Sequence, residues 1–209
     1  MKKITALRPS RGRGKRVNIY LDGRFAFSLD AEVAVREGLR PEQELSEERI
    51  NELNGSDNLQ RCMNAAQQLL GYRPRSEPEL RQRLRRRGFD DSVIEPTITR
   101  LRELGLVDDL AFARFWTENR DYFSPRSRYM TGLELRNKGV SADIIEKAVG
   151  TLDDEDSAYR AAQKKARSLP RADYDVFRRR LGDYLRRRGF GYGVINHTVE
   201  RLWREPDDE

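Results

Sequence analysis

The sequence predicts a mainly α-helical protein: an elongated array of three tandem three-helix repeats, preceded by a small N-terminal module that contains a β-hairpin. Three observations predict this class. A helix-ending phrase recurs every fifty residues or so, and apolar residues follow each copy at helical spacing. Only 37% of the residues are hydrophobic whereas 36% are charged. That balance favours small helical units, each with one buried stripe, over a single thick core.

The N-terminal module is predicted over residues 1–55. Apolar residues alternate with polar ones in "VNIYLDGRFAFSLD", on both sides of Asp22 and Gly23. An Asp-Gly pair between two alternating runs indicates a β-hairpin, and residues 3–7 are expected to add a third strand. Two helices are then expected, one capped by Asp30 and ending at Gly38, the other capped by Ser46. We expect the module to end near Asn54 and Gly55.

A basic segment joins the expected first strand to the hairpin. The stretch "RPSRGRGKR" carries five cations and no acid: Arg8, Arg11, Arg13, Lys15 and Arg16. Such a segment is expected in solvent, and an anion-binding finger is a second interpretation of it.

The repeats are marked by "LRRRGF" at residues 84–89, "LRNKGV" at 135–140 and "LRRRGF" at 185–190, with spacings of 51 and 50 residues. Gly88, Gly139 and Gly189 each follow a cation, which is typical of a glycine that ends a helix in the left-handed conformation. An apolar residue after each glycine is expected to fold back on the helix. The repeats are predicted over residues 56–106, 107–153 and 154–205.

The flanking sequence completes each three-helix unit. Prolines in "RPRS", "SPRS" and "LPRA" separate the first helix from the second. The third helix carries a buried stripe at positions i, i+4 and i+7. The stripes are Ile94, Ile98 and Leu101, then Ile145, Val149 and Leu152, then Ile195, Val199 and Leu202.

The residue types argue against catalysis. The chain has one cysteine and one histidine, so it offers no disulfide framework, no Cys/His zinc site and no Ser-His-Asp arrangement. Cys62 is expected to be a buried thiol, His197 a residue of a helix surface, and the pairs Asp108-Asp109 and Asp153-Asp154 helix N-caps. We expect no enzyme activity and no cofactor or metal. Five apolar residues are expected in the core: Leu110, Phe112, Ala113, Phe115 and Trp116.

The charge favours an anionic partner. Lys and Arg number 41 against 35 Asp and Glu, a net charge of +6. One cation suffices to cap each helix, so the others are expected on the surface, either merely solvated or in contact with phosphate or acidic side chains. The candidate contact residues are Arg85, Arg86, Arg126, Arg128, Arg136, Lys138, Arg186 and Arg187. No secretory leader and no apolar run of membrane-spanning length is evident, so a cytoplasmic protein is expected.

Two segments resemble the RecX family of bacterial recombination regulators. They are "LRELGLVDDLAFARFWTENR" at residues 101–120 and "GLELRNKGV" at 132–140, and "YRPRSEPELRQRLRRRGF" at 72–89 is similar to the family's preceding unit. The resemblance covers residues 58–205 and is weaker in the N-terminal module. In it Phe112, Trp116, Leu133, Leu135 and Gly139 occupy motif positions, which we interpret as structural.

The resemblance implies a negative regulator of the RecA recombinase. RecX proteins bind the RecA–DNA filament along its groove and inhibit its ATPase, strand exchange and coprotease activities, which affects DNA repair and the SOS response. The alternatives are a direct DNA-binding helical repeat protein without sequence preference, for single or double strands, and a plain helical scaffold. A monomer is expected.

Overall fold

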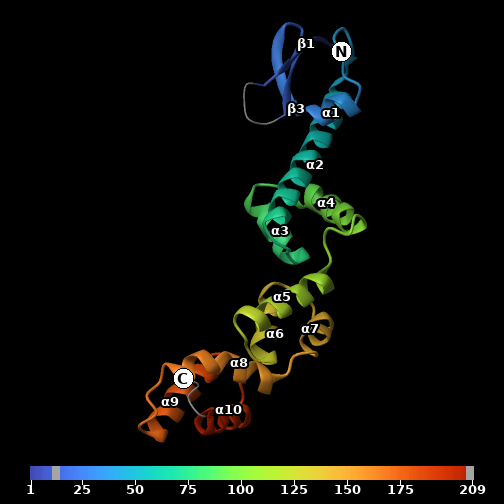
Figure 1. Cartoon of the computed structure of the whole chain (residues 1–209). Helices are drawn as coiled ribbons and strands as arrows, with labels where there is room; N and C mark the ends of the chain where they lie inside the picture. Colours follow the sequence, from blue (N-terminus) through green and yellow to red (C-terminus); the bar gives the residue numbers. More distant parts are fainter. Residues whose placement is uncertain (11–14, 206–209) are drawn as a thin grey trace. The chain divides into compact units, whose positions relative to one another are not determined.

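The computed structural model describes residues 1–10 and 15–205, and Figure 1 traces its elements along the chain. The chain forms two compact units. One consists of Met1–Arg73 with Leu80–Leu106, and the other of Pro74–Glu79 with Val107–Glu209. The described residues are mainly helical and carry a small sheet at the N-terminus, which confirms the predicted fold class.

The N-terminal sheet contains the predicted hairpin. Strands β1 (Lys2–Pro9), β2 (Arg16–Leu21), β3 (Arg24–Asp30) and β4 (Glu44–Leu45) pair antiparallel in the order β3-β2-β1-β4. Asp22 and Gly23 both have positive φ, 48° and 80°, as the two-residue turn requires. The short strand β4 was not predicted, because two residues are too few to show an alternating pattern. In the basic segment, Arg11 and Arg13 lie outside the described residues.

Two helices follow the hairpin, and both begin at the predicted caps. Helix α1 (Ala31–Arg36) is capped by Asp30, and helix α2 (Glu47–Tyr72) by Ser46, whose Oγ accepts from the backbone N of Arg49 at 3.1 Å. Helix α2 passes through Asn54 and Gly55, near which the sequence predicts the end of the N-terminal module. A glycine inside a helix costs about 1 kcal/mol, and buried Leu53 and Asp57 on either side hold the helix against β3 and Arg16.

Each repeat has three helices, as predicted. In the first repeat the C-terminal part of α2 is followed by α3 (Glu77–Arg86) and α4 (Asp91–Glu103). The second contains α5 (Asp109–Phe123), α6 (Arg128–Asn137) and α7 (Ala142–Val149). The third contains α8 (Asp154–Arg167), α9 (Tyr174–Arg186) and α10 (Tyr192–Arg204).

The three glycines end their helices as predicted. Gly88, Gly139 and Gly189 have φ values of 85°, 79° and 84°. After each of them the next residue donates its backbone N–H to the leucine carbonyl five positions back, at 3.2 to 3.4 Å. This 6→1 bond is the Schellman motif, so the recurring phrase is a helix C-cap.

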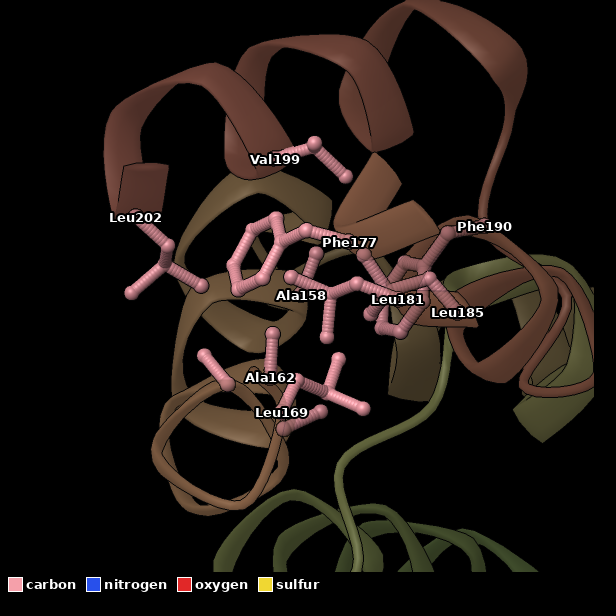
Figure 2. Packing of buried hydrophobic residues seen from close by; sticks show 11 residues of the cluster. Ala158, Ala162, Leu169, Phe177, Leu181, Leu185, Phe190, Val199 and Leu202 are labelled. Carbon is pink, nitrogen blue, oxygen red and sulfur yellow. The ribbon is translucent and has the colours of Figure 1, made fainter. Parts of the chain in front are cut away.

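The core of the third repeat shows how such a unit is packed. In Figure 2, Phe177 lies between the helix that carries Ala158 and Ala162 and the helix that carries Val199 and Leu202. The small alanine side chains let α8 approach closely, and the Phe177 ring fills the space between the helices. Leu181 and Leu185 continue the buried face of α9.

Two of the five residues expected in the core are buried, Phe112 and Ala113. Leu110 and Trp116 are half-buried, and the expectation is wrong for Phe115, which is 39% exposed because it lies on the outer face of α5. Leu133, interpreted as structural, is 37% exposed on α6. Cys62 is fully buried and His197 is exposed on α10, both as predicted. Within the described residues no helix is long and apolar enough to cross a membrane.

Candidate partner-binding surface

Three cations follow the last core leucine of α3 and α9, and the repeat spacing aligns them with three positions of α6. The first position holds Arg85, Arg136 and Arg186, which we call the outer column. The second holds Arg86, Asn137 and Arg187, the middle column. The third holds Arg87, Lys138 and Arg188, the inner column.

The outer column is exposed in all three repeats. The Arg85 guanidinium contacts the Asp91 carboxylate through two hydrogen bonds of 2.7 and 3.2 Å, and Arg186 contacts Asp183. Hydrogen bonding to Asp91 raises the pKa of Arg85, and the same contact lowers the pKa of Asp91. Arg136 has no side-chain partner among residues 1–10 and 15–205. Exposed pairs of this kind contribute little to stability, so these guanidiniums remain able to exchange partners.

The inner column folds back onto the protein. Arg87 donates to Gln68 Oε1 at 3.0 Å, and the Lys138 ammonium lies 4.1 Å from the centre of the Trp116 ring. The Arg188 guanidinium lies 4.1 Å from the centre of the Tyr184 ring. Cations held over aromatic rings act as part of the packing. Lys138, a candidate contact residue from the sequence, therefore has an intramolecular role as well.

Two further candidates, Arg126 and Arg128, are also engaged within the chain. Arg126 contacts the half-buried carboxylate of Glu134, which accepts from Trp116 Nε1 at 2.8 Å and Arg120 Nε at 2.7 Å. Arg126 and Lys138 thus meet at one cluster, made of Trp116, Glu134 and Arg120.

Arg128 closes the end of α7. Its Nε donates to the carbonyl of Leu152 at 2.5 Å, and a terminal nitrogen donates to the carbonyl of Gly150 at 3.0 Å. A cation at these carbonyls satisfies groups that the helix leaves unpaired. The middle-column residues Arg86 and Arg187 are exposed, and no side-chain partner is found for either among the residues placed by the structure.

A repeated junction lies within the second compact unit, which includes residues 74–79 at the start of α3. The Oγ of Ser76, at the start of α3, donates to the carbonyl of Lys138, at the end of α6. One repeat later, the backbone N of Ser127 donates to the carbonyl of Arg188 at 3.1 Å. The N-terminus of α3 therefore contacts the C-terminal cap of α6, and the N-terminus of α6 contacts the C-terminal cap of α9.

A carboxylate completes each junction. Asp109 Oδ1 accepts from the backbone N of Glu77, and Asp154 Oδ1 accepts from the backbone N of Arg128, both at 2.7 Å. From the sequence, both Asp pairs are expected to cap their own helices. That is confirmed for Asp108 and Asp153, whose side chains cap α5 and α8. The junction role of the second aspartate was missed, although the doubling of the acid at both places was visible.

The outer and middle columns therefore present exposed arginine side chains in each repeat. Arginine donors in the outer and middle columns match planar carboxylates and phosphates. No group of three or more His, Cys, Asp or Glu side chains within residues 1–10 and 15–205 could hold a metal ion.

Four consecutive segments of the chain match models of one family. The model of the Regulatory protein RecX N-terminal domain matches residues 2–46. The models of the first, second and third RecX three-helix domains match residues 62–101, 108–149 and 153–199. The order of these domains is the order of the sheet and the repeats described above.

Comparison with whole proteins also finds relatives named regulatory protein RecX. Regulatory protein RecX of Clostridium botulinum (strain Eklund 17B / Type B) is 31% identical over 207 residues and covers 96% of both chains. Regulatory protein RecX of Bacillus velezensis is 31% identical over 209 residues, which cover 99% of this chain and 80% of the relative.

Two solved structures share the fold. One, described as a crystal structure of regulatory protein RecX, has a TM-score of 0.69 at 22% identity and covers 96% of this chain and 100% of that chain. The other is RecX from Lactobacillus salivarius, with a TM-score of 0.61 at 24% identity, covering 70% and 97%. These matches confirm the resemblance that the motifs indicated.

Proposed function

We propose that this chain, which belongs to the RecX family of regulatory proteins, binds the RecA–DNA filament in its groove and inhibits ATP hydrolysis, strand exchange and coprotease activity. The observation that carries the proposal is the outer column. Arg85, Arg136 and Arg186 occupy the same position of three consecutive repeats and are exposed in each. A regulator of this kind needs no catalytic site of its own, and we expect it to act in the cytoplasm as a monomer.

Repetition of one weak contact suits a periodic partner. A single exposed arginine contributes on the order of 1 kcal/mol to an interface, but linked contacts raise one another's effective concentration. A filament of identical subunits on DNA presents the same acidic groups at regular intervals. Three arginines at equivalent repeat positions can therefore engage it with a combined affinity that none has alone.

Steady-state ATP hydrolysis by RecA tests the proposal. RecA from the same organism is assembled on circular single-stranded DNA, and this protein is added below the RecA concentration. Hydrolysis is expected to fall as the protein is titrated in. Unchanged hydrolysis at saturating protein would contradict the proposal.

A charge-matched pair of variants isolates the outer column. Replacing Arg85, Arg136 and Arg186 by Gln lowers the net charge from +6 to +3 and is expected to weaken inhibition strongly. The control replaces Arg61, Arg114 and Lys164 by Gln, one exposed cation from the first helix of each repeat, with the same change in charge. Equal loss in both triple variants would show that only total charge matters.

Direct binding to DNA is the competing function. The salt dependence of DNA binding distinguishes it from binding to the RecA filament. A protein that neutralises several phosphates loses affinity linearly in log salt concentration. If the outer column contacts DNA, the triple variant binds a thymidine oligonucleotide more weakly and with a flatter salt dependence. Under the RecA proposal, excess DNA does not relieve inhibition, whereas excess RecA does.

A further inference from the structure

The second and third repeats each contain a groove between their second and third helices. In the third repeat the groove has a volume of about 420 Å³, with Gly182, Phe190 and Ile195 among its lining and the arginines of α9 beside them. In the second repeat a groove of about 270 Å³ lies over Gly132 and Ile145. Both grooves lie in the second compact unit.

The two grooves are built from equivalent residues. Four lining residues of the smaller groove have an identical residue 50 positions later in the lining of the larger groove. The pairs are Arg128 and Arg178, Gly132 and Gly182, Arg136 and Arg186, and Ile145 and Ile195. The shared pattern is Arg-x-x-x-Gly-x-x-x-Arg on the second helix. Because residues four apart lie on one face of a helix, the glycine opens a gap between two arginines directly over the isoleucine of the third helix.

The first repeat shows the same place filled. Arg81 stands where the other repeats have glycine, and its guanidinium lies on Glu95 of α4 with hydrogen bonds of 2.8 and 2.9 Å. Ile94, the residue equivalent to Ile145 and Ile195, is fully buried there, whereas Ile195 is only half-buried. In the first repeat a large side chain at this position is thus accommodated by its contact with Glu95 of α4.

Packing does not require the glycine of the third repeat. A Cβ atom built on Gly182 would lie 3.6 Å from Ile195 Cγ2, an ordinary contact distance, and at Gly132 the corresponding distance is 3.3 Å. A glycine in a helix interior is destabilising relative to alanine. A methyl group at position 182 would therefore fit without a clash, and glycine leaves this space open.

We propose that each groove receives a large apolar side chain from an acidic segment of a partner protein, whose carboxylates contact the exposed arginines at the rim. These are Arg136 at the smaller groove and Arg178, Arg179 and Arg186 at the larger. For the identity of that partner, RecA, this inference rests on the proposed function. Apolar side chains are exposed at both rims, Tyr129 and Leu133 at one and Tyr192 at the other. Exposed apolar groups around a depression are typical of a protein interface.

The charges favour a protein segment over nucleic acid. The lining of the larger groove includes three arginines and two aspartates, Asp175 and Asp183, a net charge of +1, and the smaller groove has two arginines, a net charge of +2. A nucleic-acid strand carries a charge at every nucleotide and would bring phosphates against those aspartates. A peptide can place one carboxylate at an arginine and an uncharged side chain in the groove.

The test fills the larger groove by copying the first repeat. Gly182→Arg with Asn196→Glu reproduces Arg81 and Glu95, since 196 is the position equivalent to 95, and leaves the net charge unchanged. Its control is Ala111→Glu with Asn119→Arg, an equally neutral change on the exposed face of α5. Thermal unfolding is expected to show both variants folded, with the filled groove at least as stable as the wild type.

The first probe is the peptide Glu-Glu-Leu-Phe-Glu-Asp, followed by amide chemical shifts in NMR. Shifts confined to residues of α6, α7, α9 and α10 are expected in the wild type, with those of α9 and α10 lost in the filled variant. Burying one Leu or Phe corresponds to roughly a tenfold to hundredfold effect on a binding constant. A peptide that shifts none of these amides overturns the groove proposal, even if the protein inhibits RecA.

The second probe is the RecA filament, measured by inhibition of ATP hydrolysis alongside binding to a thymidine oligonucleotide. The filled variant is expected to need at least about tenfold more protein for half-inhibition, while its oligonucleotide affinity and the control variant stay unchanged. Undiminished inhibition by the filled variant contradicts the groove, whereas no inhibition by the wild type contradicts the proposed function. A matching loss of oligonucleotide binding would make the groove a nucleic-acid site and overturn the peptide proposal.

Discussion

The carboxylate of Asp109 lies 2.7 Å from the backbone nitrogen of Glu77, and the pair recurs one repeat later as Asp154 and Arg128 at the same distance. The two aspartates at the start of α5, and the two at the start of α8, therefore have separate tasks. One caps its own helix, and the other closes the N-terminus of the second helix of the preceding repeat. A helix N-terminus attracts negative charge, so each bond also neutralises a partial positive charge.

Removal of either junction carboxylate should destabilise the second compact unit. Asp109→Ala and Asp154→Ala each leave a backbone N–H without its acceptor, and loss of a comparable N-cap costs about 1 kcal/mol. Urea unfolding followed by circular dichroism measures the change. Glu118→Ala, an exposed acid on α5, is the control and should have no effect. Equal stability of all three variants would show that the junction does not contribute.

The three cap glycines should differ in their tolerance of alanine. All have φ near 80°, so alanine is strained at each by about 1–2 kcal/mol. At Gly88 the added Cβ meets open space, but at Gly139 it would lie 2.5 Å from Pro78 Cβ. Gly139→Ala should therefore lower the free energy of unfolding more than Gly88→Ala does. The reverse order in urea titrations would contradict the close approach of Pro78.

The Glu134 carboxylate is expected to hold its cluster together. Glu134→Gln keeps the shape but removes the charge between Arg120 and Arg126, so the unfolding free energy should fall by about 2 kcal/mol. Trp116 loses its carboxylate acceptor, and its fluorescence in the native state should change. Glu146→Gln on the exposed face of α7 serves as the control, and an unchanged Trp116 environment would argue against the cluster.

Burial of Cys62 should make stability fall at alkaline pH. Desolvation raises the pKa of this thiol, and a hydrogen bond with Thr97 opposes the effect. A pKa raised in the folded state gives a contribution that is complete below the unfolded pKa, about 8.5, and is lost as pH rises through the folded pKa. Urea titrations from pH 7 to 10 should show this decline in the wild type. In Cys62→Ala the decline should be shallower, and identical slopes would contradict the prediction.

How much the sequence could predict depends on the range of the interaction. Helix caps and turns depend on residues within about four positions of each other. The roles of Ser46, Asp108 and the three cap glycines could therefore be predicted from the neighbouring sequence. Gly55 lies inside α2, where burial of Leu53 on the same helix outweighs the local preference of glycine. The junction of Asp109 with Glu77 spans 32 residues, and a single sequence gives no sign of which distant N–H a carboxylate will accept from. The same limit hid the groove glycines, whose meaning depends on a facing helix.

The inner and outer columns of cations are expected to differ in what they contribute: the inner column to stability and the outer column to binding. Lys138→Ala removes an ammonium from the Trp116 ring and a neighbour of Glu79, so it should lower the unfolding free energy by about 1 kcal/mol. Arg136→Ala removes an exposed guanidinium with no ion-pair partner in the described part of the chain, so stability should stay within about 0.5 kcal/mol of the wild type. In the RecA assay the order of the two variants should reverse. Arg136→Ala should weaken inhibition of ATP hydrolysis more than Lys138→Ala does, although it is the more stable variant. If both variants lose inhibition only in proportion to their loss of stability, the outer column has no contact role.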